Sequence, residues 1–359
     1  MAECHGGNIY LLASCLGMAE NGIIDFSASI NPLGVPVSVR SAIKENLECL
    51  FNYPDPDTKR LRLKIAEHVG IDADSIVCGN GSTELIYLIA RALRPTNVLI
   101  PAPTFSEYKR ACTRSPGVSI AWHELKRGVC FDIDPEALMR AMAGENSLSP
   151  PCDMVFLCNP NNPTGRLIKI DDMLRIAGAA ARFKCMLVVD AAFVDFCPDA
   201  SVIDEVKNNP YLVVLRSLTK IYALSGLRIG YAVLPSSLLG TVKEAKEPWT
   251  VNTLAQIAGV AALDDAAYKT ETFRVIEEEK QSLEAGFARL RITYLPSSAN
   301  YYLLQMKKAQ EVISCLRMKG ILARDCSNFP GLDGTYIRVA VKSKKDNVKF
   351  LREIAACGV

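Results

Sequence analysis

The sequence is poor in the residues and patterns that several common functions require. It has only three histidines in 359 residues, and none of its 13 cysteines lies in C-x-x-C spacing, so neither a zinc site nor a disulfide framework is supported. Its 41 basic and 39 acidic residues leave a formal net charge of +2, which gives no reason to expect nucleic acid or an anionic membrane surface as a partner. No apolar run approaches the length that spans a bilayer.

What remains is the composition of an ordinary globular enzyme, with 49% hydrophobic and 22% charged residues. Cys78, Cys158 and Cys185 lie in apolar runs, where a free cysteine behaves as a small buried hydrophobe. That usage fits a reducing compartment, and residues 1–5 show no basic stretch followed by an apolar one. We therefore expect a cytoplasmic protein, and a chain of this length predicts a large domain plus a smaller one.

Strand-like and helix-like segments alternate through the middle of the chain. The apolar runs that read as buried parallel strands are Ile76–Cys78, Val98–Pro101, Met154–Cys158, Met186–Asp190 and Tyr211–Leu215. This alternation predicts an α/β fold with a doubly wound, mostly parallel sheet. After Leu234 helices dominate, with a few strands, which predicts a smaller α+β domain. The expected division is 1–45 packing with the small domain, 46–240 as the large domain and 241–359 as the small domain.

Polar residues follow the carboxyl ends of three of these strands. Asn162, Asp190 and the segment Ser217–Lys220 each come after a separate apolar run. In a doubly wound sheet such ends open onto one crevice, where ligands bind. A carboxylate at the end of a buried strand is costly unless a cation or a strong donor meets it. We therefore expect these residues to converge on one site.

The stretch from Leu215 to Gly230 reads L-R-S-L-T-K-I-Y-A-L-S-G-L-R-I-G. A lysine at this position, Lys220, suits an aldehyde cofactor held as a Schiff base, while Ser217, Thr219 and Arg228 hold that cofactor's phosphate. Taken alone, the S-x-x-K pattern is explained equally well by a solvated lysine in a loop.

A second candidate phosphate site follows the first strand. Gly79 to Glu84 reads G-N-G-S-T-E and leads into the apolar periodic segment Leu85–Leu93. Glycines, hydroxyls and a helix start together form a phosphate cradle from backbone N–H groups and the helix dipole. The simpler alternative is that Ser82 or Thr83 caps the helix.

Two further segments carry weaker signals. His5-Gly6-Gly7-Asn8 could turn backbone N–H groups and an imidazole toward an anion, although the residues alone favour a terminus rich in turn residues. Tyr53 lies in the loop Asn52–Pro56, which two prolines keep extended. Tyr53 either packs locally or reaches into a neighbouring site.

In this order, the motifs resemble those of the fold-type I pyridoxal phosphate (PLP) enzymes of the aspartate aminotransferase superfamily, over nearly the whole chain. The segments that carry the resemblance are Gly79–Glu84, Asn159–Gly165, Asp190, Ser217–Lys220 and Gly226–Gly230. The resemblance implies PLP as cofactor and an aspartate-aminotransferase-like fold. Such a fold has a large domain, with a mostly parallel seven-stranded sheet between helices, and a smaller α+β domain.

The resemblance also implies roles for individual residues. Lys220 and Asp190 are the expected catalytic residues: Lys220 holds the cofactor and then moves protons, and Asp190 keeps the pyridine nitrogen protonated. Asn162 donates to the phenolic oxygen of the cofactor. The remaining expected cofactor ligands are Gly81, Ser82, Thr83, Ser217, Thr219 and Arg228 at the phosphate, Phe105 stacked on the ring, and Tyr53 at the phosphate of the other subunit of a homodimer.

One position departs from the superfamily pattern. Relatives usually have a tyrosine three residues after the aspartate, and its hydroxyl supports the cofactor oxygen. Here that position is Phe193, in the run D-A-A-F. Either Asn162 acts alone at this oxygen, or another group takes the place of the missing hydroxyl.

Within the superfamily the chain resembles both histidinol-phosphate aminotransferases and threonine-phosphate decarboxylases, notably in Arg324–Gly331 and Tyr336–Val341. The N-terminal motifs His5–Asn8 and Asp25–Gly34 are more similar to those of the decarboxylases, which makes His5 an expected ligand of a substrate phosphate. Arg324 and Arg338 are expected to bind the substrate's two anionic groups, the alternative being ordinary surface arginines. The implied substrate-binding residues are His5, Gly6, Asn31, Asn162, Arg324 and Arg338.

The expected reaction is PLP-dependent decarboxylation of O-phospho-L-threonine to (R)-1-aminopropan-2-yl phosphate for cobalamin synthesis, with O-phospho-L-serine as a further candidate substrate. The first alternative is a histidinol-phosphate-type aminotransferase that uses 2-oxoglutarate. The second is a PLP-fold ligand sensor without catalysis, which intact Lys220 and Asp190 and the lack of a basic DNA-binding extension disfavour. The only expected partners are a small phosphorylated substrate and a second copy of the chain; no metal, nucleic acid or membrane is expected.

Overall fold

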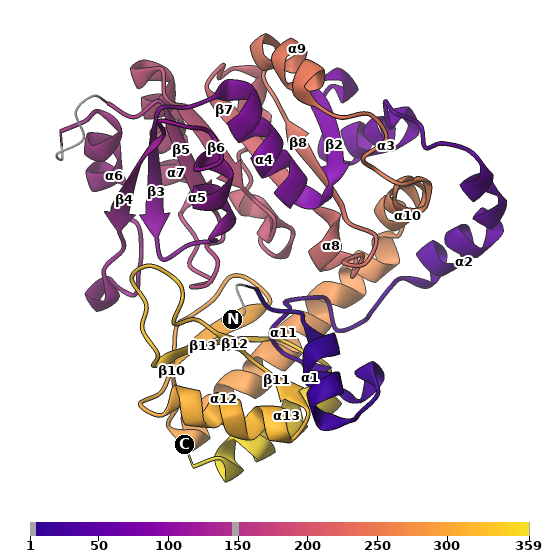
Figure 1. Ribbon diagram of the computed structural model, residues 1–359, viewed down its shortest axis with the longest axis vertical. Helices are drawn as coiled ribbons and strands as arrows, with labels where there is room; N and C mark the ends of the chain where they lie inside the picture. Colours follow the sequence, from indigo (N-terminus) through magenta and orange to yellow (C-terminus); the bar gives the residue numbers. More distant parts are fainter. Residues whose placement is uncertain (1–4, 146–150, 359) are drawn as a thin grey trace.

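The computed structural model describes residues 5–145 and 151–358. These residues form a larger lobe built on one wide sheet and a smaller lobe built from the C-terminal part of the chain, with the first described residues near the junction of the two (Figure 1). The expected α/β architecture is confirmed.

The larger lobe contains a seven-stranded sheet in the order β2-β8-β7-β6-β5-β3-β4. Neighbouring strands are parallel except for β8, which pairs antiparallel with both β2 and β7. Each apolar run that predicted a strand forms one. The strands are β2 (Ile76–Asn80), β3 (Asn97–Ala102), β4 (Ser119–Glu124), β5 (Met154–Cys158), β6 (Met186–Asp190), β7 (Leu212–Ser217) and β8 (Ile229–Val233).

Helices cover both faces of this sheet, because its central strands are apolar on both sides. Along β6, Val188 faces one core, whereas Leu187 and Val189 face the other. The first face is covered by α4 (Gly81–Leu93), α5 (Glu107–Cys112) and α9 (Ser236–Ala245). The second is covered by α3 (Lys59–Val69), α6 (Pro135–Met142), α7 (Ile170–Phe183) and α10 (Thr253–Leu263). The short helices α2 (Val37–Glu45) and α8 (Leu218–Ile221) complete this lobe.

The smaller lobe has a four-stranded antiparallel sheet in the order β12-β13-β10-β9. Its strands are β9 (Thr293–Tyr294), β10 (Tyr301–Gln305), β12 (Arg324–Asp325) and β13 (Tyr336–Ala340), and its helices are α11 (Ala266–Leu290), α12 (Ala309–Met318) and α13 (Lys344–Ala356). The long helix α11 runs from the larger lobe into the smaller one (Figure 1).

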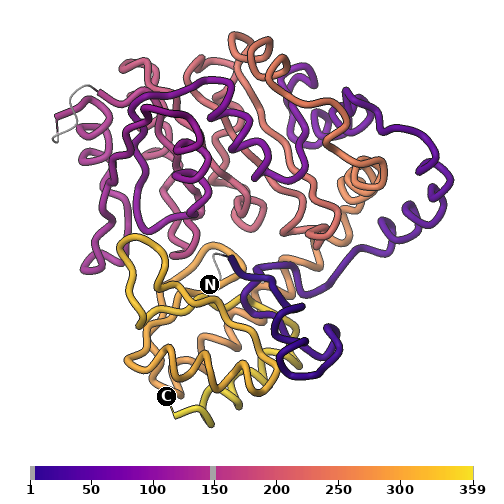
Figure 2. Tube along the Cα trace, viewed as in Figure 1, coloured from indigo at the N-terminus to yellow at the C-terminus, as the bar shows by residue number. Residues whose placement is uncertain are grey.

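The N-terminal segment lies against this smaller lobe (Figure 2). Its strand β1 (Ile24–Asp25) pairs in parallel with β11 (Ile321–Leu322), and the ring of Phe26 stacks on Phe350 with centroids 4.6 Å apart. Helix α1 (Ile9–Leu16) packs beside them. The two ends of the chain therefore build one layer.

The domain ranges expected from the sequence remain a prediction. In the structure, Ala255 and Ala258 of α10 lie in the same hydrophobic core as the second face of the large sheet. Close packing is possible there because Gly259 faces Leu61 of α3. The change of lobe along the chain therefore takes place within α11.

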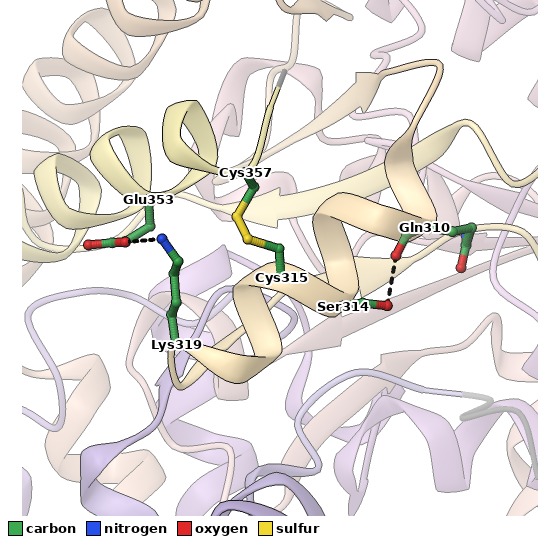
Figure 3. The surroundings of a disulfide bond; sticks show 6 residues. All are labelled: Gln310, Ser314, Cys315, Lys319, Glu353 and Cys357. Atoms are coloured by element: carbon green, nitrogen blue, oxygen red, sulfur yellow. Dashed lines mark hydrogen bonds and ion pairs between the residues drawn. A yellow bond between two sulfur atoms is a disulfide. The ribbon is translucent and has the colours of Figure 1, made fainter.

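The expectation that the cysteines form no disulfide is wrong for one pair. Cys315 of α12 and Cys357, at the end of α13, are joined by a disulfide (Figure 3). An ion pair of 2.6 Å between Lys319 and Glu353 connects the same two helices. The two cysteines are 42 residues apart in the sequence, so only the packing of the helices brings them together. The other ten cysteines within the described ranges are free thiols.

Among the residues that the structure describes, no helix combines the length and the apolarity needed to cross a membrane. The same described ranges contain no cluster of three or more side chains suited to hold a metal ion.

Candidate active site

A cavity of about 490 Å³ opens where the carboxyl ends of the large sheet face the smaller lobe. Both lobes and the N-terminal segment contribute to its wall. The predicted site residues that line it are His5, Gly6, Ser82, Thr83, Phe105, Asn162, Asp190, Ser217, Thr219, Lys220, Arg228, Arg324 and Arg338.

The sheet topology explains why distant residues meet in this cavity. Strands β6 and β7 are parallel and end at Asp190 and Ser217, so both residues lie at the same edge. Strand β8 runs in the opposite direction and begins at Ile229. Its first residues therefore lie at the edge where β6 and β7 end, and Arg228, just before β8, lies there too. Parallel strands and one reversed strand thus deliver an acid, a hydroxyl and a guanidinium to one place.

Lys220 occupies the short helix α8, directly after β7. The pKa of its amine is lowered to about 8, mainly by burial and then by the positive charges of Arg338 and Arg228, against the opposing effect of Asp190. Its Nζ lies 5.6 Å from the centre of the Phe193 ring. An amine with this pKa is partly neutral near physiological pH, which is what a nucleophilic or proton-accepting lysine requires.

Asp190 is buried at the end of β6. Burial raises the pKa of its carboxyl, while hydrogen bonds from Tyr108 and from the backbone of Ala192, together with the charge of Lys220, lower it. The Tyr108 hydroxyl donates to Oδ2 at 2.7 Å, and the Ala192 amide donates to Oδ1 at 3.1 Å. The strong donor that the sequence required is therefore Tyr108, which we did not predict as a site residue.

The hydroxyl-rich end of the cavity is built for close approach of the backbone. Gly81 begins α4 with φ of 77°, and a Cβ there would lie 2.5 Å from Nη2 of Arg228. A Cβ on Gly230 would lie 2.6 Å from the amide nitrogen of Ser82. Ser217 and Thr219 are joined by a 2.7 Å contact between their hydroxyl oxygens. Hydroxyls, a helix N-terminus and a guanidinium thus surround one point, which suits a phosphate.

Two buried arginines lie at the opposite side, in the smaller lobe. Arg324 of β12 pairs in register with Arg338 of β13, and the two residues are 5% and 7% exposed. Like charges directly opposite each other on paired strands repel, so this arrangement favours an anion between or beside them.

Contacts hold both guanidiniums in place. Arg338 donates to the backbone oxygen of Ser27 at 2.6 Å and to Oδ1 of Asn162, and its buried Nε has no hydrogen-bond partner in the described part of the chain. Arg324 donates to Asn328 at 3.0 Å and lies over the ring of Phe329. The cavity therefore has two cationic ends, one in each lobe.

Three predicted residues do not line the cavity. Gly81 lies behind the lining residues, where its lack of a side chain leaves room for the Arg228 guanidinium. The Asn31 amide is buried and donates to Ile221 O at 2.6 Å and Thr272 Oγ1 at 2.7 Å, which fixes the chain beside Lys220. Tyr53 is 81% exposed and lies against the ring of Trp249. The binding roles expected for these three residues remain predictions.

Phe193 lacks the hydroxyl that relatives have at this position, and the neighbouring Tyr301 does not supply one in its place. Phe193 lines the cavity and meets Tyr301 edge-on, with ring centroids 4.9 Å apart. The Tyr301 hydroxyl, however, donates to the backbone oxygen of Asn161 at 2.8 Å. The amide of Asn162 therefore stays the expected donor to a cofactor oxygen on this side.

Other residues that line the cavity were not predicted. Phe193, and the residues that lie within Asp25–Gly34 and Arg324–Gly331, belong to segments singled out in the sequence but were given no binding role. The others have no motif of their own and lie next to predicted residues. They are Ser27, Ala28, Ser29, Ser106, Glu107, Arg110, Cys158, Ala192, Phe193 and Phe329.

Comparison with known proteins agrees with this geometry. The family model described as aminotransferase class I and II matches residues 21–354. The chain is 39% identical over 353 residues to a threonine-phosphate decarboxylase of Salmonella typhimurium, covering 97% of this chain and 95% of that protein.

Two solved structures are similar over most of the chain. The L-threonine-O-3-phosphate decarboxylase of Porphyromonas gingivalis matches with a TM-score of 0.81 and 30% identity, covering 93% of this chain and 99% of the other. The histidinol-phosphate aminotransferase of Clostridium acetobutylicum matches with a TM-score of 0.85 and 30% identity, covering 93% of this chain and 98% of the other. The expected resemblance is confirmed: the chain belongs to the aminotransferase class I and II family.

Proposed function

We propose that this protein is a PLP-dependent decarboxylase of O-phospho-L-threonine, forming (R)-1-aminopropan-2-yl phosphate and carbon dioxide. The observation that carries the proposal is the cavity with two cationic ends, one for the phosphate of the cofactor and one for the anionic groups of the substrate. The likeness to threonine-phosphate decarboxylases over nearly the whole chain supports it. The product is the type of amino-alcohol phosphate that cobalamin synthesis uses, and O-phospho-L-serine is a second candidate substrate.

The residues at the larger-lobe end fit PLP. Lys220 would bind the cofactor aldehyde, and Asp190 would hold the proton on its pyridine nitrogen. Ser82, Thr83, Ser217, Thr219 and Arg228 would hold the phosphate. Three features support the fit: the lowered pKa of Lys220, the buried carboxylate of Asp190, and the space at Gly81 that a Cβ would fill.

When bound, PLP supplies an electron-accepting ring for the electron pair left on Cα as carbon dioxide departs. The chain's own residues decide which bond at Cα breaks. Arg324 and Arg338 would bind the carboxylate and, together with His5, the phosphate ester of the substrate. Holding both anions fixes the orientation of Cα, so that the bond to the carboxylate is the one that is activated. Lys220 Nζ would then return a proton to Cα.

One assay tests the proposal. The protein loaded with PLP is incubated with O-phospho-L-threonine, with and without 2-oxoglutarate, while carbon dioxide and glutamate are both measured. Carbon dioxide without glutamate is the expected result. Asp190→Ala is expected to keep the cofactor and lose most of the rate, and near-normal turnover by this variant would contradict the role proposed for Asp190.

A histidinol-phosphate-type aminotransferase is the second candidate, because the solved histidinol-phosphate aminotransferase structure matches as well as the decarboxylase structure does. In that reaction Lys220 would move the Cα proton to the cofactor instead of returning a proton after decarboxylation. Glutamate that appears only when histidinol phosphate and 2-oxoglutarate are both present would favour this candidate.

We further propose that the protein works as a homodimer in the cytoplasm. Exposed apolar residues gather near the loop that carries Tyr53: Leu47, Leu50, Phe51 and Trp249. Tyr53 would contribute from such a surface to the site of the other subunit. Ten of the described cysteines are free thiols, as is usual in a reducing compartment, and the Cys315–Cys357 disulfide is the exception. Light scattering at micromolar concentration would give the mass of a dimer, and a Tyr53→Ala variant would bind PLP more weakly.

A further inference from the structure

The segment that carries His5 has no helix or strand of its own and is held by two anchors. The first anchor is its backbone. The Gly7 amide donates to Ser27 Oγ at 2.7 Å, and a Cβ on Gly6 would lie 2.4 Å from Ser27 O. The backbone of this segment is thereby fixed against the Ser27 wall of the cavity.

The second anchor is the His5 side chain, which reaches the larger lobe. Its Nε2 lies 2.9 Å from Oε1 of Glu107, the first residue of α5, and its ring lies 5.9 Å from that of Phe105. Arg110 Nη1 lies 3.6 Å from the same oxygen. One carboxylate oxygen therefore faces two cationic or potentially cationic groups at the rim of the cavity.

Glu107 itself is buried and hydrogen-bonded, whereas the two groups that it meets are exposed. It is only 5% exposed, and its other oxygen, Oε2, accepts a hydrogen bond from the Tyr87 hydroxyl on α4. The side chains of His5 and Arg110 are 43% and 58% exposed. A buried carboxylate therefore lies beneath two side chains that are largely exposed to solvent.

A buried acid is unexpected in the wall of a cavity whose other charged groups are mostly basic. Burying a carboxylate is costly unless it is paired, and an acid near a bound anion repels it. The arrangement makes sense if the acid orders the cations. An exposed histidine or arginine loses conformational freedom when it clamps a ligand, and a partner that fixes it in advance reduces that cost.

We propose that Glu107 is a positioning residue for the phosphate ester of the substrate, holding His5 and Arg110 at the rim so that both face the bound phosphate. This inference rests on the proposed function, in which the substrate carries a phosphate. The guanidinium of Arg110 offsets the charge of the Glu107 carboxylate, so that the rim carrying His5 and Arg110 can accept an anion. The His5–Glu107 contact also links the N-terminal segment to α5. The site for the substrate phosphate is therefore formed between the two lobes.

The test uses the PLP-loaded protein and isopropyl phosphate, a phosphate ester that has no amine to react with the cofactor. Calorimetry gives its dissociation constant for the wild type, Glu107→Gln, His5→Ala and the double variant. Glu107→Gln keeps the size of the side chain and can still bond Tyr87, but it lacks the charge. Glu353→Gln is the matched control, because it removes a carboxylate that pairs with Lys319 far from the cavity.

The expected result is binding about tenfold weaker for Glu107→Gln and for His5→Ala. The double variant should be scarcely weaker than either single one, because the two residues act as a unit. Glu353→Gln should bind as the wild type does, and all variants should keep their cofactor absorbance and melting temperature within a few degrees. Tyr87→Phe should weaken binding in the same direction by a smaller factor.

Three outcomes would overturn the inference. Unchanged binding by Glu107→Gln would mean that His5 and Arg110 need no anchor, and the decarboxylase proposal would be unaffected. Tighter binding would mean that Glu107 merely repels the anion. If the wild type itself does not bind isopropyl phosphate at millimolar concentrations, the rim holds no phosphate site. A wild type that nevertheless released carbon dioxide from O-phospho-L-threonine would leave the proposed reaction standing.

Discussion

The Tyr108 hydroxyl donates a 2.7 Å hydrogen bond to Oδ2 of Asp190, inside the core of the larger lobe. The Tyr108 ring stacks on Phe156 of β5, with centroids 5.1 Å apart and planes 6° from parallel, so the hydroxyl cannot swing away. The carboxylate of Asp190 is therefore oriented by an aromatic residue that is itself fully buried.

Removing this hydroxyl with Tyr108→Phe should raise the pKa of Asp190, since the bond from Tyr108 lowers that pKa against the effect of burial. Leaving a buried carboxylate oxygen unpaired should also cost about 1–3 kcal/mol of stability. We expect turnover to fall about tenfold and the acid limb of the pH–rate profile to move to higher pH. Tyr268→Phe is the control, because its hydroxyl donates to Gly34 O at 2.7 Å away from the cavity. Equal loss of turnover in both variants would contradict a specific role for Tyr108.

The pKa of Lys220, lowered to about 8 by burial first and by Arg338 and Arg228 next, predicts how cofactor-free protein takes up PLP. Only the neutral amine attacks an aldehyde, so the rate of uptake should rise with pH, with an inflection near 8, and level off above about 9. Stopped-flow absorbance at the band of bound cofactor measures it. In Arg338→Met a neighbouring positive charge is lost, so the pKa of Lys220 and the inflection should both rise. An inflection near the ordinary lysine pKa in the wild type would refute the prediction.

Gly81→Ala should weaken PLP binding strongly. Its φ of 77° disfavours any side chain, and the new Cβ would press on Nη2 of Arg228 from 2.5 Å. Gly117 is a matched control, since its φ is 81° and a Cβ there meets nothing within 4 Å. Both variants should lose about 1–2 kcal/mol of stability from backbone strain. Only Gly81→Ala should lose cofactor affinity, by tenfold or more in an absorbance titration. Equal PLP affinities of the two variants would show that a Cβ at residue 81 does not displace the Arg228 guanidinium.

The disulfide between Cys315 and Cys357 should stabilise the smaller lobe by limiting the unfolded chain. A closed loop of 42 residues corresponds to about 4 kcal/mol in the chain-entropy model. Cys357→Ser, or added dithiothreitol, should therefore lower the denaturant midpoint, and dithiothreitol should have no further effect on the variant. If reductant shifts wild type and variant equally, the bond does not form in solution.

The large sheet could be predicted from the sequence because its strands are apolar on both faces and end abruptly in polar residues. The run Met186–Asp190, for example, is a strand bounded as expected, and its terminal acid marks the site. Convergence of Asn162, Asp190 and Lys220 followed from that topology. In each case a local pattern encoded the position.

The contacts that could not be predicted join residues without a local pattern. Tyr108 and Asp190 are 82 positions apart, and nothing around Tyr108 distinguishes it from a core aromatic. The sequence around Glu107 likewise gives no sign that this residue contacts His5, which only the structure shows. Asn31 illustrates the reverse case, a polar residue in a promising motif whose amide is used to fix the backbone. The chemistry of single residues here is set by tertiary neighbours.

The parallel pairing of Ile24 with Ile321 has a consequence for the protein during its synthesis. The larger lobe can fold as it leaves the ribosome, but the wall that carries His5 and Ser27 has no partner until residue 321 has been made. The growing chain would therefore acquire its cofactor end well before its substrate end. A chain assembled in this order completes the wall of its cavity only late in translation.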